Sequence, residues 1–183
     1  MITRLSVLLL LLGLVSFATT AHAQRDHLTP QEVDLVKEAQ VLDKRIEIFI
    51  KAADRRILVL NGGSAAVANT KQSKKEAELW GELPTGSRAE LVSDIAKILD
   101  EAIMNIDDVS ARDERNPLIA KSLRRLAQAV NTIMEQLKPL STTAKSDAEV
   151  ASFDQLNEDA QSILEAANKL PPEPEKKTKT KGN

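Results

Sequence analysis

The chain of 183 residues contains no cysteine and no tyrosine. Without cysteine it can form no disulfide framework, no thiolate zinc site and no iron–sulfur cluster. Of its two histidines, His22 lies in a segment that we expect to be removed, which leaves His27 alone. A single histidine near the N-terminus of the remaining chain excludes catalysis by a Ser–His or Cys–His nucleophile. It also argues against paired haem ligands and against di-iron sites built on Glu-x-x-His pairs.

Aromatic residues are also scarce, at 2% of the chain. A glycosidase that works through a carboxylate pair would need a cleft lined with aromatic rings, which this chain can hardly supply. The acidic residues between 107 and 114 could form a calcium loop, but the EF-hand pattern fails because its turn glycine and its twelfth-position glutamate are missing. We therefore expect a non-catalytic protein with no cofactor and no bound metal.

Charge of one sign is not in excess, since 25 basic residues stand against 27 acidic ones. This mild acidity, together with the export expected below, argues against nucleic acid as a partner. Basic residues do gather in two groups: Lys51, Arg55 and Arg56, and Lys121, Arg124 and Arg125. We interpret both groups as parts of a mixed, solvated face, with a surface for an anionic partner as the alternative.

Long hydrophobic runs are confined to the N-terminus. Arg4 precedes an apolar stretch over residues 5–17, and Ala21-His22-Ala23 supplies the small residues that flank a cleavage site before Gln24. The apolar stretch is shorter than the ~20 residues that span a bilayer. We expect residues 1–23 to be a cleaved signal peptide. The protein is then exported, periplasmic or secreted, with no transmembrane segment after cleavage.

What the chain does have is helical periodicity. At Thr29-Pro30, threonine can cap a helix and proline fits the first helical position, while Glu32 can complete a capping box. Apolar residues then recur at steps of three and four: Ile46, Ile50, Ala53, Ile57 and Leu60. A strand would instead alternate by two, so this spacing predicts one long helix over residues 30–60.

The stretch Asn61-Gly62-Gly63 follows an apolar run and so resembles a β-strand that leads into a phosphate-binding loop. A loop of the GxxxxGK[ST] kind needs a lysine followed by serine or threonine, and residues 62–70 contain no lysine. The two glycines instead predict a left-handed cap at the C-terminus of the long helix.

Three further helices are predicted over residues 88–106, 117–137 and 147–169. Their starts are indicated by pairs of capping residues: Ser87 with Glu90, Asn116 with Pro117, and Ser146 with Glu149. Each has an apolar stripe at helical spacing: Val92, Ile95, Leu99, Ala102 and Ile106; Ile119, Leu123, Leu126, Val130, Ile133 and Leu137; Phe153, Leu156, Ala160, Ile163, Ala167 and Leu170. Pro139 is expected to end the middle helix of the three.

The steps average near 3.5 residues, which favours helices that cross at ~20° in a left-handed, coiled-coil-like packing. We therefore expect an all-α protein whose domain, residues 24–170, is a four-helix bundle. The long connection 61–86 has room for a short helix from Ser73 to Trp80, and it either crosses over the bundle or covers one end. The tail 171–183 is rich in proline and lysine and is expected to be disordered, with a possible contact to an anionic envelope polymer.

The long helix also carries a second apolar line away from its main stripe: Val41, Ile48, Ala52 and Val59. One interpretation is burial on two sides, under the other helices and the long connection. The other is a seam for self-association or for a protein partner. Trp80 has the same two interpretations, because it can plug one end of the core or anchor a partner.

Leu28-Thr29-Pro30-Gln31 resembles the Leu-Thr-x-x-Gln motif of the small helical periplasmic stress chaperones related to Spy. Here the glutamine stands one place early, Glu32 occupies its usual position, and the motif is not repeated. The resemblance implies an ATP-independent holdase that keeps unfolded clients on a concave basic and apolar surface. The residues themselves favour a non-catalytic protein-binding or structural component of the bacterial envelope, with the partner unassigned. Both hypotheses stand at this point.

Overall fold

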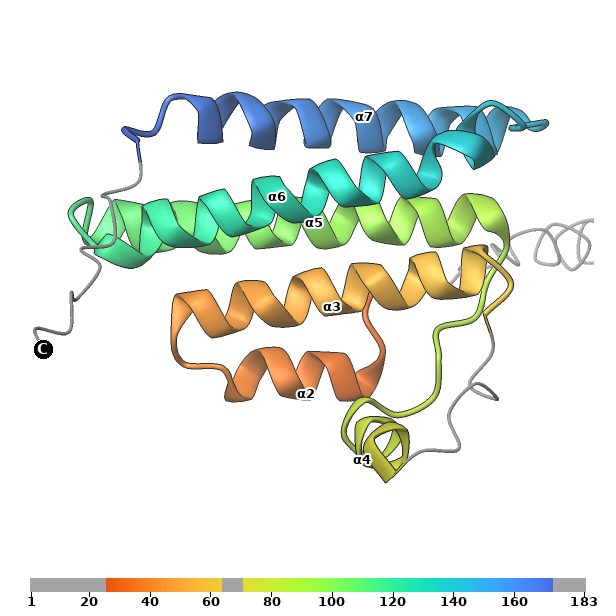
Figure 1. The fold of residues 1–183 in the computed structure, drawn as a ribbon, viewed down its shortest axis with the longest axis horizontal. Helices are drawn as coiled ribbons and strands as arrows, with labels where there is room; N and C mark the ends of the chain where they lie inside the picture. Colours follow the sequence, from red (N-terminus) through yellow and green to blue (C-terminus); the bar gives the residue numbers. More distant parts are fainter. Residues whose placement is uncertain (1–25, 64–70, 173–183) are drawn as a thin grey trace, which may run out of the picture.

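The computed structural model describes residues 26–63 and 71–172, and in these residues the chain is all-α, without a strand. The helices pack together in a bundle-like arrangement (Figure 1). No helix in the described ranges is both long and apolar enough to cross a bilayer. The predicted signal peptide, residues 1–23, and the tail from residue 173 onward lie outside the described residues.

Six helices lie within the described ranges: α2 (Pro30–Glu38), α3 (Leu42–Leu60), α4 (Lys71–Trp80), α5 (Arg88–Arg112), α6 (Pro117–Ser141) and α7 (Asp147–Asn168). α5 and α6 each pack against both α3 and α7, and they pack less extensively on each other. α3 and α7 therefore lie on opposite sides of the α5–α6 pair (Figure 1). α3 and α6 run in one direction along the bundle, while α5 and α7 run in the other.

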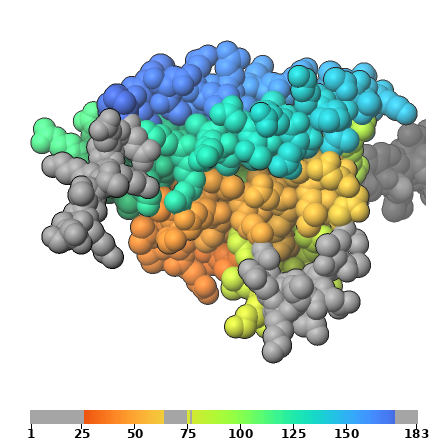
Figure 2. All heavy atoms as spheres, viewed as in Figure 1, coloured from red at the N-terminus to blue at the C-terminus, as the bar shows by residue number. Residues whose placement is uncertain are grey.

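Neighbours in the sequence are thus not always the closest neighbours in space. α5 and α6 are joined by the short connection 113–116, yet each packs more extensively on α3 and α7 than on the other. In the space-filling view, side chains of α3, α6 and α7 cover the face toward the viewer, and little of α5 is visible (Figure 2).

The apolar stripes predicted from the sequence form the core. All five stripe residues of α5, from Val92 to Ile106, are at most 3% exposed. The stripes of α6 and α7 are buried from Leu123 to Leu137 and from Phe153 to Ile163, respectively. Helices with stripes of this spacing bury one face each, which accounts for the bundle-like packing.

The predicted helix 30–60 is wrong in one respect, because it is interrupted at residues 39–41. Ala39 and Val41 have extended backbone, with ψ of 93° and 128°, and α2 folds back along α3 (Figure 1). This reversal brings Leu28 into the core and buries Glu32 completely. The free energy gained by burying these two side chains outweighs the local preference for a continuous helix. Because this burial depends on residues far away in the sequence, a local pattern cannot reveal the interruption.

The predicted helix starts are confirmed. Complete capping boxes are formed by Thr29 with Glu32 at α2 and by Ser87 with Glu90 at α5. The other two starts use a single side-chain cap each, from Asn116 at α6 and from Ser146 at α7. These caps satisfy backbone N–H groups that have no partner within the helix.

The predicted glycine cap at the end of α3 is also confirmed. Gly62 has the left-handed backbone expected of it, with φ of 74°. Its N–H donates to the carbonyl of Val59 at 2.9 Å, and the N–H of Gly63 donates to the carbonyl of Leu58 at 2.8 Å. This pair of bonds is a Schellman motif, so the glycines end a helix and do not cradle a phosphate.

Two helices run further than predicted, while α7 and α4 agree with their predicted spans to within two residues. α5 continues beyond residue 106 to Arg112, whose Nε donates to the carbonyl of Asp108 at 2.9 Å. α6 continues beyond residue 137 to Ser141 and contains Pro139. Pro139 has no N–H and so removes one helical hydrogen bond, and because it lies in the last turn, only Leu140 and Ser141 follow it in the helix.

In its described part, the connection 61–86 neither crosses over the bundle nor covers one end. α4 packs against α2, on the outer side of the layer formed by α2 and α3 (Figure 1). Trp80, at the end of α4, is 8% exposed and belongs to the core. The core thus extends beyond α3 to the two short helices.

Candidate functional site

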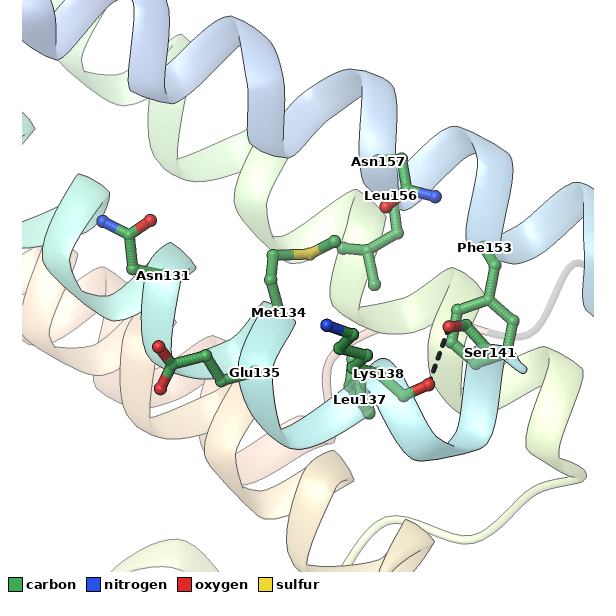
Figure 3. A pocket seen from close by; sticks show the side chains of 9 residues that line it. All are labelled: Asn131, Met134, Glu135, Leu137, Lys138, Ser141, Phe153, Leu156 and Asn157. Atoms are coloured by element: carbon green, nitrogen blue, oxygen red, sulfur yellow. Dashed lines mark hydrogen bonds between the residues drawn. The ribbon is translucent and has the colours of Figure 1, made fainter. Parts of the chain in front are cut away.

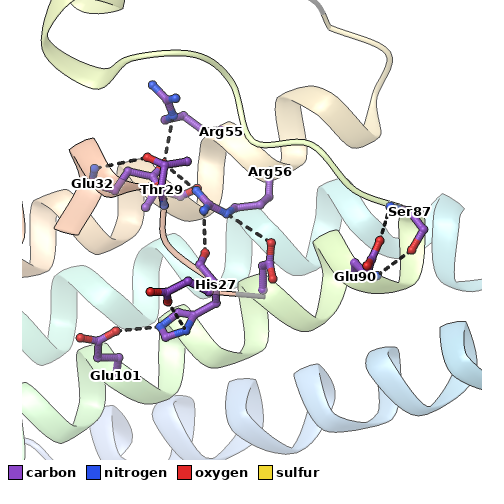
Figure 4. A network of polar contacts seen from close by, with 11 residues as sticks. His27, Thr29, Glu32, Arg55, Arg56, Ser87, Glu90 and Glu101 are labelled. Atoms are coloured by element: carbon purple, nitrogen blue, oxygen red, sulfur yellow. Dashed lines mark hydrogen bonds and ion pairs between the residues drawn. The ribbon is translucent and has the colours of Figure 1, made fainter. Parts of the chain in front are cut away.

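One group of ionisable side chains lies inside the described part of the protein. Glu32, Arg55, Arg56 and Asp94 come from α2, α3 and α5, and each is at most 6% exposed. We call these four residues the inner cluster (Figure 4). Two carboxylates stand against two guanidinium groups, so the charges balance in a place where water cannot compensate them.

Glu32 is at the centre of the inner cluster. Its Oε2 accepts a hydrogen bond from the N–H of Thr29 at 2.9 Å and closes the capping box. Its Oε1 lies 2.6 Å from Nη1 of Arg56 and 3.1 Å from Nε of Arg55. One side chain therefore both starts α2 and attaches α2 to α3.

Arg56 connects three segments of the chain. Besides its bond to Glu32, Nη1 donates to the carbonyl of Ala52 at 2.9 Å, and Nη2 donates to the carbonyl of His27 at 2.6 Å. Its Nε lies 3.9 Å from Oδ2 of Asp94 on α5. A planar guanidinium can hold several fixed acceptors at once, which a lysine ammonium in the same place could not.

Arg55 attaches the segment that follows α4. Its guanidinium carbon lies 5.6 Å from the centre of the Trp80 ring, within the range of a cation–π contact. Its Nη2 also donates to the carbonyl oxygens of Gly81 and Glu82. The interpretation of Arg55 and Arg56 as part of a solvated face is therefore wrong, because both side chains hold partners from other segments in the interior.

His27 is fixed by the same region. Its Nε2 lies 2.8 Å from Oε2 of Glu101 on α5, and its side chain is 26% exposed (Figure 4). This contact holds His27 against α5. Within residues 26–63 and 71–172, no three His, Cys, Asp or Glu side chains lie close enough together to hold a metal ion.

A second group of charges lies between α3 and α6, nearer to solvent. Oδ2 of Asp43 accepts from Nζ of Lys121 at 2.7 Å, and Oδ1 lies 2.9 Å from Nη1 of Arg125, which also contacts Glu47. We call these four residues the outer cluster. The hydrogen bond from Lys121, with the positive charges of Arg125 and Lys121, holds the pKa of the Asp43 carboxyl below its usual value, although burial opposes this.

A single strong ion pair joins the beginnings of α5 and α7. Nη2 of Arg88 lies 2.6 Å from Oε2 of Glu149, and the backbone N–H of Lys145 donates to the same carboxylate oxygen at 2.7 Å. The hydrogen bond from Arg88, followed by that from Lys145, lowers the pKa of Glu149 to about 2. This contact ties the N-terminus of α7 to α5.

The residues predicted as a partner seam differ in their exposure. Ala52 is fully buried and Trp80 nearly so, while Ile48 and Val59 are half-buried. Val41 alone is well exposed, at 49%. Burial on two sides of α3 therefore describes Ala52, and burial in the core describes Trp80, in this conformation. The seam as a place where a partner binds stays a prediction.

An apolar groove of about 340 Å³ lies between the second half of α6 and the first half of α7 (Figure 3). Its apolar lining consists of Met134, Leu137, Phe153 and Leu156. Polar side chains surround this lining: Asn131, Glu135, Lys138, Ser141 and Asn157. Leu137, Phe153 and Leu156 are core residues that reach the floor of the groove, whereas Met134 is half-buried and accessible.

A groove between α5 and α7 has a different chemistry. It is lined by Lys97, Asp100, Ser152 and Asp159 among others. Burial raises the pKa of the Asp159 carboxyl, and the negative charge of Asp100 adds to this rise.

Sequence reasoning missed the inner cluster and assigned Glu32 to helix capping alone. One signal could have revealed it: α3 carries apolar residues on two faces, which leaves little solvated surface for Arg55 and Arg56. The partners of the two arginines could not be found this way, because they lie on other helices.

Compared with protein-family models, with curated proteins and with solved structures, the chain matches none.

Proposed function

We propose that this chain is an exported, non-catalytic protein of the bacterial envelope that acts by binding another protein. The groove between α6 and α7 carries the proposal. An apolar floor with a polar rim, between two helices, suits an amphipathic segment that inserts its apolar side chains and leaves its polar face outward. Met134 lies at the accessible edge, and a flexible thioether adapts to side chains of different shapes.

The use of the ionisable side chains supports a non-catalytic role. Glu32 and Arg56 are buried and engaged with each other or with backbone carbonyls, so a substrate could not reach them. The strongly shifted carboxyl, Glu149, forms an ion pair that connects two helices. Asp159, whose pKa is raised, does line the groove between α5 and α7, but no histidine among the described residues lines that groove to form a nucleophile–base pair with Ser93 or Ser152.

The groove is tested by substitution of Met134, with Met104 as the matched control. Met104 is 52% exposed on α5, so it has the same chemistry outside the groove. A photo-cross-linking residue at position 134 should capture a defined envelope protein in living cells, and the same residue at 104 should not. With the photo-cross-linking residue placed instead at Asn157, on the rim of the same groove, Met134→Lys should abolish the capture and leave the thermal unfolding midpoint nearly unchanged. Equal capture at both positions, or none at 134, would refute the groove as the binding site.

The holdase hypothesis is the alternative, and the same groove supports it. An open, adaptable apolar groove can hold exposed segments of unfolded clients, as in binders that accept many sequences. Purified protein should then suppress the light scattering of a client that aggregates on dilution, at a near-stoichiometric ratio. Met134→Lys should weaken this suppression, and Met104→Lys should not. Scattering that is unchanged by the unmodified protein would leave only the specific-partner hypothesis.

Three finer features belong to the same proposal. We infer cleavage before Gln24, which N-terminal sequencing of the exported protein tests. We infer left-handed crossings of the four long helices near ~20°, from the mean step of 3.5 residues. We also infer that the lysines between 176 and 181 attract anionic envelope polymer, and a salt-dependent co-sedimentation assay tests that attraction.

A further inference from the structure

The turn between α2 and α3 has little local reason to exist. Its residues, Ala39, Gln40 and Val41, include neither glycine nor proline. Val41 is the N-cap of α3, but it makes no side-chain capping bond and is 49% exposed. Alanine and glutamine are good helix formers, and the apolar pattern continues through the turn. Locally, the sequence therefore favours one straight helix over residues 30–60.

The reversal is held by contacts from outside the turn. Leu28 is buried in the core, and Glu32 is bound by Arg55 and Arg56. The carbonyl of Ala39 accepts a hydrogen bond from Nε of Arg45 at 3.0 Å. α2 has 9 residues, too few for a helix that is stable in water by itself. Residues 26–38 thus keep their place by docking onto α3 and α5.

We propose that residues 26–38 exchange between two copies of the chain. In the exchanged form, residues 30–60 become one straight helix, ~45 Å long at 1.5 Å per residue. Glu32 of each copy then binds Arg55 and Arg56 of the other. All docking contacts of residues 26–38 are kept, because the second copy carries the same site, and only the turn changes.

The folded-back monomer and the exchanged dimer differ in only a few contacts, and these contacts set the equilibrium between the two forms. The folded-back form has two side-chain bonds at the turn, from Arg45 to the carbonyl of Ala39 and from Gln40 to the carbonyl of Lys37 at 2.9 Å, and a straight helix replaces both with intrahelical bonds. The exchanged form gains helical backbone at residues 39–41 and loses the freedom of two separate molecules. It is therefore favoured at high protein concentration. This inference does not rest on the proposed function, since it needs neither the α6–α7 groove nor another protein.

The absence of cysteine from the chain allows a direct test. His27→Cys and Glu101→Cys replace two side chains that lie 2.8 Å apart between the docked segment and α5. The two single variants are mixed, unfolded, refolded together at high concentration and treated with a short bis-maleimide. Covalent heterodimers are the expected product. The control mixes His27→Cys with Glu158→Cys, an exposed position on α7, which does not pack against α2, and should give none.

Variants of the turn shift the balance in opposite directions. Gln40→Pro forbids a straight helix and should lower the dimer association constant at least a hundredfold, as measured by light scattering behind a sizing column. If this variant fails to fold by circular dichroism, Gln40→Gly replaces it, with a loss of roughly twentyfold from its two copies. Arg45→Met removes a bond specific to the folded-back form and should raise the dimer fraction several-fold. A protein that stays monomeric after concentrated refolding, or a dimer in which the mixed single variants give no link between residues 27 and 101, would overturn the proposal.

Discussion

The inner and outer clusters both join α3 to other helices through ion pairs, but they differ in their access to water. The inner carboxylate, Glu32, is 0% exposed and binds an arginine that is 1% exposed. In the outer cluster, Lys121 is 55% exposed and Glu47 is 40% exposed, although Asp43 itself is buried. The same type of contact therefore occurs in two dielectric environments within one protein.

The consequence of losing a partner depends on this difference. A charge left alone in the inner cluster has no water to replace the missing partner, so the full desolvation penalty remains. In the outer cluster, Lys121 and Arg125 can turn toward solvent when Asp43 is absent. The inner cluster fixes the position of α2 and of the segment after α4, whereas the outer cluster mainly adds to a contact that apolar residues already define.

The largest expected effect follows from Glu32→Ala. This change removes the carboxylate that contacts both Arg55 and Arg56, leaves Asp94 at 3.9 Å from Arg56, and also removes the capping box of α2. The free energy of unfolding should fall by about 3–5 kcal/mol. Urea denaturation followed by circular dichroism measures the change, with Glu47→Ala as the control. A loss below about 1 kcal/mol would mean that the inner cluster is hydrated.

A smaller effect is expected for Asp43→Ala in the outer cluster. The change removes the buried carboxylate together with its bonds to Lys121 and Arg125, but both cations can then be hydrated. Asp43 also lies in the first turn of α3, where a negative charge is favourable. The same denaturation experiment should give a loss of about 1–2 kcal/mol. A loss equal to that of Glu32→Ala would erase the distinction between the two clusters.

The difference between the clusters also explains what the sequence could predict. The spans of α5, α6 and α7 follow from apolar steps and capping pairs, which are local patterns within one helix. The capping box of Thr29 and Glu32 was predictable for the same reason, because its two residues are three apart. Local patterns extended α3 backward through residues 39–41, since nothing in those residues breaks a helix.

The inner cluster could not be predicted in this way. Glu32 and Arg56 are separated by 24 positions and meet only because α2 reverses direction. Without that reversal, two adjacent arginines on a helix are typical of a solvated face. Trp80 illustrates the same limit, because its contact with Arg55 depends on the path of the chain between α3 and α4. Each contact that the sequence did not predict joins residues of separate secondary-structure elements.

The ion pair between Arg88 and Glu149 lies in an environment between those of the two clusters, with side chains 26% and 17% exposed. Its contribution to stability can be tested by lowering the pH. Because the folded-state pKa of Glu149 is lowered to about 2, its ionised form stabilises the protein at pH values above its ordinary pKa. This contribution is lost as the pH falls from about 4.5 toward 2. Thermal midpoints should therefore drop more steeply over this window for the unmodified protein than for Glu149→Gln. Parallel curves would show that the pair contributes equally in the unfolded chain.

The smallest effect is expected for Lys121→Ala, at the most exposed end of the outer cluster. The bond to Asp43 is short, at 2.7 Å, but Lys121 gives up side-chain freedom to form it and is screened by solvent. Asp43 keeps Arg125 at 2.9 Å, so no buried charge is left without a partner. The loss should be at most about 1 kcal/mol and should shrink further in high salt. A larger, salt-independent loss would mean that Asp43 and Lys121 are as desolvated as Glu32 and Arg56. The two clusters would then not differ in their access to water, and the expected order of stability losses would be wrong.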